Sequence, residues 1–306
     1  MKRASRKPKK ANQNLAKAKD AKRDEFYTPL PDIERELKHY KRHFRGKTVY
    51  CNCDDPKVSN FYRYFFLNFK ELGLKRLIAT CYKNDDPDAR SRGVSKQAVC
   101  LEYDGKDETK RRLAGDGDFR SEECVALLER ADIVVTNPPF SLFREYVAQL
   151  IEHDKKFLII GNINAITYKE TFRLIKENKI WLGYNCIRHF IQPDGSMFET
   201  ARTFWYTNLD ITKRHEDLPL YKKYNSDEYP KYDNYDAIEI GKATEIPVDY
   251  AGGMGVPITF LDKYNPDQFE IIGIDRALVE KLTGKVSRFH IKAKEIYARI
   301  VIRRKP

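Results

Sequence analysis

The chain of 306 residues lacks the features that mark membrane and secreted proteins. No uninterrupted apolar run approaches the roughly 20 residues that a membrane span needs, and the charged N-terminus has no apolar segment typical of secretory signals. The six cysteines are scattered, without the spacing of a disulfide framework or a zinc ribbon. These absences predict a cytoplasmic protein that has no membrane anchor, no structural metal and no disulfides.

The sequence contains enough apolar residues for a hydrophobic core, and it has an excess of positive charge. Hydrophobic residues make up 41% of the chain and aromatic residues 12%, which is typical of a globular protein. Of the net charge of +12, residues 1–23 carry +9, from ten Lys/Arg and one acid, and this segment is expected to be a disordered basic arm. Lys281–Lys305 hold nine Lys/Arg and one acid between apolar residues. Both clusters indicate a polyanion partner; the alternatives are a solubilising extension and a solvated strand face.

The apolar pattern of the first half alternates between strands and helices. Strands are expected at residues 47–53, 76–82, 97–103, 132–136 and 156–160, and helices at 59–72, 124–129 and 142–152. This alternation predicts an α/β fold with a parallel sheet, whose ligands lie beyond the carboxyl ends of the strands. After about residue 180 the sequence becomes richer in tyrosines and loops, so we expect a core at residues 24–180 and a second region at 181–306.

One expected strand, Asp132–Thr136, runs directly into Asn137, Pro138, Pro139 and Phe140. The prolines fix φ and lack N–H donors, so the turn is stiff and presents acceptors: the Asn137 side-chain oxygen and the Pro138 carbonyl. Two acceptors beside an aromatic ring suit a planar amino group, because they bind its hydrogens while the ring stacks on the attached heterocycle. The alternative is a plain strand end followed by a Pro-Pro loop.

Asn/Asp-Pro-Pro-aromatic is the common signature of amino-methyltransferases that use S-adenosylmethionine. Phe140 is typical of their N6-adenine branch, and a similar motif serves enzymes that methylate glutamine. Three further segments resemble the N6-adenine enzymes in their order along the chain: Phe26–Pro29 as the N-terminal cofactor motif, Val49–Pro56 as the first-strand loop and Asp118-Phe119 as the site for the cofactor adenine.

Longer segments resemble the EcoRI-type modification methyltransferase family, over about residues 24–300. These are Val49–Pro56, Gly161–Glu170 and Met254–Phe260. The resemblance implies a Rossmann-like S-adenosylmethionine-dependent methyltransferase sheet, with a C-terminal target-recognition region that completes the core. It implies that Asn137–Phe140 are catalytic. It also implies a set of cofactor-binding residues: Phe26, Thr28, Pro29, Asn52, Asp54, Asp55, Asp118 and Phe119.

The chain departs from the usual methyltransferase pattern in its first loop. Cys53–Lys57 contains none of the two or three glycines that let the backbone approach the cofactor's methionine moiety. Asp54 or Asp55 could pair with the cofactor ammonium group, and a helix N-cap or a surface acid is the alternative. Asp118 is expected to accept from the cofactor adenine, against a plain turn at Gly115–Asp118. The residue that binds the ribose stays open.

The resemblance also implies a substrate and partners. Members act as monomers on a short palindromic site in double-stranded DNA, GAATTC for the namesake, and a restriction endonuclease acting on the same site is a candidate partner whose existence the sequence leaves open. A base inside a duplex cannot reach the turn, so the adenine must be flipped out. Candidate DNA-binding residues are Arg188, Arg202, Arg288 and Arg299, with phosphate contact or no contact as the alternative. An RNA adenine methyltransferase, a catalytically silent DNA-binding scaffold and a glutamine-modifying enzyme are the competing functions.

Overall fold

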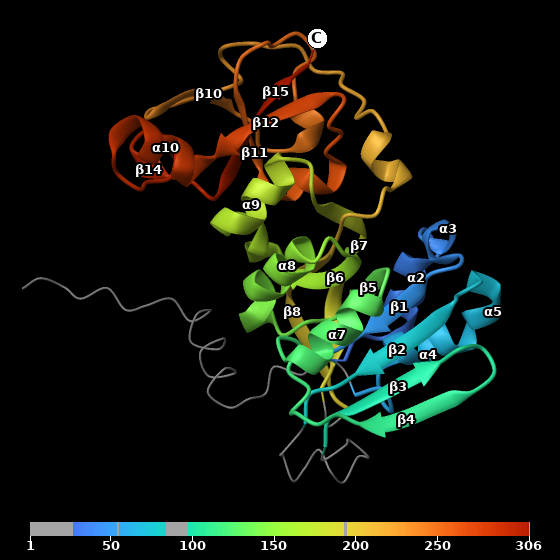
Figure 1. Cartoon of the computed structure of the whole chain (residues 1–306). Coiled ribbons are helices and arrows are strands. Elements are labelled where there is room, and N and C mark those ends of the chain that lie inside the picture. Colours follow the sequence, from blue (N-terminus) through green and yellow to red (C-terminus); the bar gives the residue numbers. More distant parts are fainter. Residues whose placement is uncertain (1–26, 54, 84–96, 193–194, 306) are drawn as a thin grey trace, which may run out of the picture. The chain divides into compact units, whose positions relative to one another are not determined.

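The computed structural model describes residues 27–53, 55–83, 97–192 and 195–305. The chain divides into two compact units, each discontinuous in sequence (Figure 1). The first unit contains residues 1–162 and 185–204, and the second contains 163–184 and 205–306. The expected basic arm lies outside the described residues. Which segments form the catalytic core and the target-recognition region remains a prediction.

A mixed sheet of eight strands forms the centre of the first unit. In spatial order its strands are β4 (Glu108–Arg112), β3 (Val99–Tyr103), β2 (Arg76–Thr80), β1 (Thr48–Cys51), β5 (Ile133–Thr136), β6 (Lys156–Asn162), β8 (Met197–Thr207) and β7 (Trp181–Ile191). β2, β1, β5 and β6 are parallel, whereas β3 and β4 are antiparallel additions at one edge. Because β1 and β5 are paired through Val49 and Ile133, their carboxyl ends meet at one edge of the sheet. The sheet confirms the predicted α/β, Rossmann-like fold.

The helices of the first unit begin and end at residues suited to those positions. They are α2 (Leu30–Leu37), α3 (Lys41–Phe44), α4 (Asn60–Leu67), α5 (Phe69–Leu72), α7 (Glu122–Arg130), the 3₁₀ turn η1 (Phe140–Leu142) and α8 (Phe143–Glu152). Ser59 caps α4 and Ser121 caps α7 by accepting from backbone N–H groups, and Gly73 ends α5 at a φ of 63°. The single helix expected at 59–72 is wrong in one respect. It is interrupted at Asn68, whose side-chain amide donates to the Tyr64 carbonyl at 2.8 Å.

The second unit contains a separate sheet of five strands. Its order is β12 (Phe269–Ile274), β15 (Arg299–Arg304), β11 (Met254–Pro257), β10 (Tyr235–Glu239) and β9 (Lys231–Tyr232). Around it lie the hairpin β13 (His290–Ile291) and β14 (Lys294–Glu295), the helices α9 (Lys169–Lys176) and α10 (Asp275–Thr283), and the 3₁₀ turns η2 (Ile163–Thr167), η3 (Thr212–His215), η4 (Ala243–Glu245) and η5 (Ile258–Lys263). Tyr232 and Phe289 stack at 4.4 Å between ring centroids and anchor a local apolar core with Val279 and Val301.

The sequence predicted the buried strands better than the exposed ones. The five strands expected in the first half correspond to β1, β2, β3, β5 and β6. β4 was missed because all five of its residues are polar and exposed, so it has no apolar alternation. Among the described residues, no helix is both long and apolar enough to cross a membrane, and no group of side chains has the composition of a metal site.

Candidate active site

The Asn-Pro-Pro-Phe turn lies at the carboxyl end of β5, in the first unit. Asn137 is only 8% exposed and Pro138 is buried, while Pro139 and Phe140 are half-buried. Pro139 has an extended backbone, and its carbonyl accepts from Leu142 N at 3.0 Å, so the chain passes directly into η1 and α8. The turn is therefore held between a central strand and a helix, with little freedom to move.

Asn52, at the carboxyl end of the neighbouring strand β1, is hydrogen-bonded from two sides. The Thr136 hydroxyl donates to the Asn52 carbonyl, and the Tyr146 hydroxyl donates to the Asn52 side-chain oxygen. All three residues are buried. Burial raises the pKa of Tyr146 well above its ordinary value, so this hydroxyl stays a proton donor at any physiological pH. These bonds join the predicted cofactor residue Asn52 to Thr136, which precedes the predicted catalytic turn.

Thr136 and Tyr146 were not among the predicted site residues. Thr136 belongs to the apolar strand itself, and Tyr146 occupies a position of α8 that the helical pattern assigns to the core. No feature of the sequence separates a core tyrosine from one whose hydroxyl binds a loop. Only the pairing of β1 with β5 brings these side chains together.

The Asp118-Phe119 segment packs against the carboxyl end of β2. Gly117 has a φ of +80°, and a Cβ atom at this residue would lie 2.1 Å from the Cys81 carbonyl oxygen, so only glycine fits. Phe119 is buried and meets the edge of the Tyr146 ring at 5.0 Å between centroids. The ends of β1 and β5 and the segment between β4 and α7 therefore converge on Tyr146, either directly or through Asn52.

Asp118 is ionised and firmly oriented. Arg120 donates from Nε and Nη2 to its two carboxylate oxygens, at 2.9 and 2.6 Å. These hydrogen bonds from the guanidinium hold the pKa of Asp118 below its ordinary range. In the Gly115–Asp118 turn that was the alternative to a cofactor role, Asp118 N donates to the Asp116 carboxylate at 3.0 Å. The Asp118 carboxylate remains an acceptor in this arrangement, and its role toward an adenine amino group remains a prediction.

Thr28 offers a buried hydroxyl in the predicted cofactor motif. Its side chain is 1% exposed, and its Oγ1 has no hydrogen-bond partner among the described residues. Asn60 fixes the backbone here by donating to the Thr28 carbonyl at 2.8 Å. A buried hydroxyl without a partner is costly, so this residue fits a bound polar ligand. Phe26, in the same motif, lies outside the described residues.

The loop after β1 reaches a left-handed conformation without glycine. Cys53 has a φ of 78°, which is rare for residues other than glycine, asparagine or aspartate. Asp54 lies outside the described residues. Asp55 is buried, its Oδ1 accepts from Lys57 N at 3.0 Å, and its carbonyl accepts from Ser59 N at 2.8 Å just before α4. Asp55 is thus neither the N-cap of α4, which is Ser59, nor a surface acid, and its contact with a cofactor stays a prediction. Strain of this kind is typical of functional loops.

The β7 strand brings aromatic and backbone contacts to the same region. Phe190 meets Phe140 edge-on, with ring centroids 6.1 Å apart. The neighbouring Ile191 forms two backbone hydrogen bonds with Tyr27, of 2.9 and 2.8 Å. The Asn137–Phe140 turn and the segment that contains Thr28 are therefore both in contact with the end of β7.

The four arginines predicted to bind DNA have different surroundings. Arg188 on β7 and Arg202 on β8 are exposed. Arg299 is mostly buried and donates from Nε to Glu239 at 2.9 Å, and Arg288 lies 3.5 Å from the buried carboxylate of Asp275. The second pair of arginines is thus already neutralised within the second unit. Contact with DNA remains a prediction for all four.

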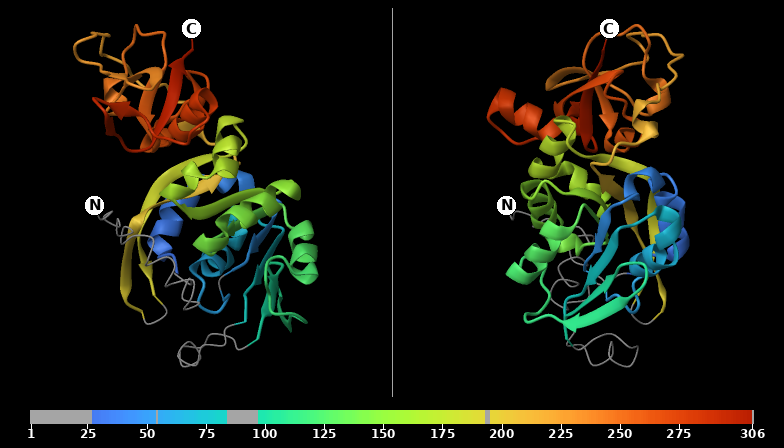
Figure 2. Two further views of the ribbon diagram at one scale, coloured as in Figure 1. Left: turned by 90° about the vertical axis from the view of Figure 1, so that its left-hand side faces the viewer. Right: turned by 45° about the vertical axis from the view of Figure 1, so that its right-hand side comes forward.

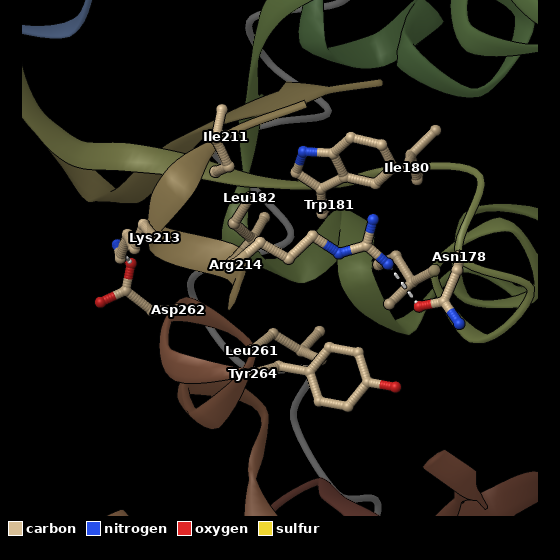
Figure 3. A pocket seen from close by; sticks show the side chains of 11 residues that line it. Asn178, Ile180, Trp181, Leu182, Ile211, Lys213, Arg214, Leu261, Asp262 and Tyr264 are labelled. Carbon is tan, nitrogen blue, oxygen red and sulfur yellow. Dashed lines mark hydrogen bonds and ion pairs between the residues drawn. The ribbon is translucent and has the colours of Figure 1, made fainter. Parts of the chain in front are cut away.

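A small pocket lies in the second unit (Figure 3). Its lining residues are Ile175, Asn178, Ile180, Trp181, Leu182, Ile211, Lys213, Arg214, Leu261, Asp262 and Tyr264. The Arg214 guanidinium lies 4.0 Å from the centroid of the Trp181 ring and donates to Asn178 at 2.6 Å, while Lys213 pairs with Asp262 at 2.6 Å. Burial lowers the pKa of Arg214. Both cations have partners within the pocket wall, and no predicted catalytic or cofactor residue lines it.

Comparison with known proteins gives a consistent result over almost the whole chain. The family model described as adenine-specific methyltransferase EcoRI matches residues 14–305. Type II methyltransferase M.EcoRI from Escherichia coli is 51% identical over 92% of this chain and 96% of that protein. Type II methyltransferases M.MpnI from Mycoplasma pneumoniae and M.MgeORF184P from Mycoplasma genitalium are 39% and 37% identical, each over 94% of this chain and over 97% and 98% of their own lengths. No solved structure matches.

Proposed function

The chain belongs to the EcoRI family of adenine-specific methyltransferases, and we propose that it transfers a methyl group from S-adenosylmethionine to N6 of an adenine in a short specific site of duplex DNA. The names of its relatives, Type II methyltransferases, support DNA as the substrate and modification of a restriction site as the purpose. One observation carries the proposal. The buried Asn137 turn stands beside Asn52, whose two hydrogen bonds join the ends of β1 and β5 to α8.

The residues of the first unit fit the cofactor. Bound S-adenosylmethionine supplies the electrophilic methyl group. The buried hydroxyl of Thr28, which has no partner among the described residues, suits a polar group of this ligand. Phe119 offers an aromatic ring, and the ionised Asp118 offers acceptor oxygens for an adenine amino group.

The catalytic turn acts by placing acceptors. The lone pair of an adenine amino nitrogen is delocalised into the ring, which makes the nitrogen a poor nucleophile. Hydrogen bonds from this amino group to the Asn137 side-chain oxygen and the Pro138 carbonyl favour a pyramidal nitrogen with a localised lone pair. Positioning and charge placement then suffice, and no strong base is needed.

The target adenine leaves the duplex to reach this turn, because base pairing hides its amino group. Phe140 is half-buried, and its ring meets the Phe190 ring edge-on, so the protein fixes the orientation of the Phe140 ring. Stacking of a base on an aromatic ring is worth roughly 1–3 kcal/mol, which offsets part of the cost of extrusion.

The remaining partners follow from family and charge. We expect a monomer in the cytoplasm, with the basic segment 1–23 adding affinity for DNA that is independent of sequence and sensitive to salt. Exposed Arg188 and Arg202 are suited to phosphates or base edges. A restriction endonuclease of the same specificity is the expected biological partner.

The test is transfer of labelled methyl from S-adenosylmethionine to unmethylated plasmid DNA and to matched RNA, followed by nucleoside analysis. The proposal requires N6-methyladenine in DNA only. Label in RNA alone would make the enzyme an RNA methyltransferase. The absence of label from both would contradict methyl transfer to nucleic acid.

A further inference from the structure

The hairpin of β7 and β8 exposes two large apolar side chains where β8 begins. Met197 is 58% exposed and Phe198 is 39% exposed. Just before them, Gln192 N donates to the Ser196 carbonyl at 2.8 Å and connects the two strands. Adjacent exposed apolar side chains of this size are typical of an interaction surface, since folding gives no reason to leave them in water.

The last residues of β7, which lead into this end of the hairpin, contact the proposed active site. Phe190 contacts the catalytic Phe140, and Ile191 pairs with Tyr27 through two backbone hydrogen bonds. Met197 and Phe198 follow within a few residues along the hairpin, which Figure 2 shows as a long curved pair of yellow strands. If a nucleotide is bound at Phe140, the DNA strand that contains it therefore passes close to Met197 and Phe198.

The chemistry of the hairpin suits a DNA duplex. In its described part the charged side chains are Arg188, Arg202 and a single acid, Glu199, and all three are exposed. Arg188 and Arg202 can contact phosphates, whereas the exposed side chains where β8 begins, Met197 and Phe198, are apolar. Phenylalanine and methionine are among the side chains that proteins insert between base steps.

We propose that the Met197-Phe198 pair supplies the apolar side chain that enters the base stack where the target adenine leaves it, and so holds the adenine in the active site. The inference rests on the proposed function, because it needs an extruded adenine. Extrusion leaves a gap in the stack, and apolar side chains that fill this gap replace part of the lost stacking. Neighbours in a strand point to opposite faces, so one of the two residues is expected to contribute more than the other.

The test compares two substrates in which extrusion of the same adenine has a different free-energy cost. The site is first mapped on unmethylated plasmid DNA with the wild-type enzyme. Synthetic duplexes then present the same adenine either opposite thymine or opposite an abasic position. The proteins are the wild type, Met197→Ala, Phe198→Ala, the double variant, and Leu67→Ala as a control, since Leu67 is a 66% exposed apolar residue at the end of α4 in the same unit.

The proposal predicts that the double variant loses about tenfold to a hundredfold in kcat/KM on the paired duplex, the range expected for lost stacking. On the abasic duplex it should stay within about threefold of the wild type, because extrusion breaks no base pair there and costs less. Leu67→Ala should match the wild type on both. With 2-aminopurine at the target position, the double variant should show a smaller fluorescence increase on binding.

Three outcomes would overturn the proposal. Equal losses on the paired and abasic duplexes would show a fault in binding or folding. Unchanged rates of the double variant on both duplexes would show that Met197 and Phe198 have no role in methylation. Light scattering that shows these two residues joining two copies of the chain would also overturn the proposal. Failure of the wild type on both duplexes and on plasmid DNA would instead contradict the proposed function itself.

Discussion

The two units use their polar side chains in different ways. In the first, hydrogen bonds gather at the carboxyl ends of parallel strands, where Thr136 and Tyr146 both bind Asn52. In the second, charged side chains pair with one another inside the fold, as Arg299 does with Glu239. In the proposed function the first arrangement orients groups toward a ligand, whereas the second pairs charges that the fold has largely buried.

This difference explains why residue type alone does not identify a binding residue. Arg202 and Arg299 both lie in strands, β8 and β15, and both were predicted to contact DNA. One is exposed and the other is held by a buried carboxylate. What an arginine does therefore depends on the partner that the fold supplies, and that partner can be sixty residues away in sequence.

The largest effect on stability is expected from breaking a pair in the second unit. Arg299→Ala leaves Glu239, whose side chain is 14% exposed, with its charge uncompensated, and loss of one partner of a buried pair costs about 3–5 kcal/mol. Arg202→Ala, at an exposed site, should stay within about 0.5 kcal/mol of the wild type. Urea denaturation measures both. An Arg299→Ala protein that is as stable as the control but has lost DNA affinity would make Arg299 a DNA-binding residue after all.

A smaller effect is expected from the strained loop of the first unit. Cys53→Val places a β-branched residue at a φ of 78° and should destabilise the protein by about 1–3 kcal/mol. Cys53→Gly should keep or raise stability, because glycine adopts this conformation freely. Denaturation, together with calorimetric titration of S-adenosylmethionine, separates the two variants. Equal stability of the valine and glycine proteins would mean that the loop carries no strain.

The smallest effect is expected from the hydroxyl that connects the loops. Tyr146→Phe removes the hydrogen bond to Asn52, and the loss of one such bond predicts a rise in KM for S-adenosylmethionine of roughly fivefold to tenfold. Tyr62→Phe is the matched control, since its hydroxyl binds Glu108 at 2.5 Å in the same unit. The control should lose stability without a change in KM. If both variants leave KM unchanged, Asn52 does not depend on Tyr146 for its position.

The sequence predicted much of the first unit because its signals are local. An apolar run that ends in two prolines predicts β5 and its turn, and the apolar pattern predicts α4 and α7, although α7 begins at Glu122 and not at the expected residue 124. Tyr146 and Thr136 could not be predicted, since their hydrogen bonds depend on strand pairing between distant segments. Most strands of the second unit were also missed, because they are short and separated by polar, tyrosine-rich loops.

The central claim is that the Asn137 turn performs the reaction, and it is tested most directly by single-turnover methyl transfer with Asn137→Ala and Asn137→Asp. The account predicts that the alanine protein loses at least about a hundredfold in rate, while its Kd values for S-adenosylmethionine and DNA change little. The aspartate protein keeps an acceptor oxygen and should retain more activity than the alanine protein. An Asn137→Ala enzyme with a near-normal transfer rate would contradict the account.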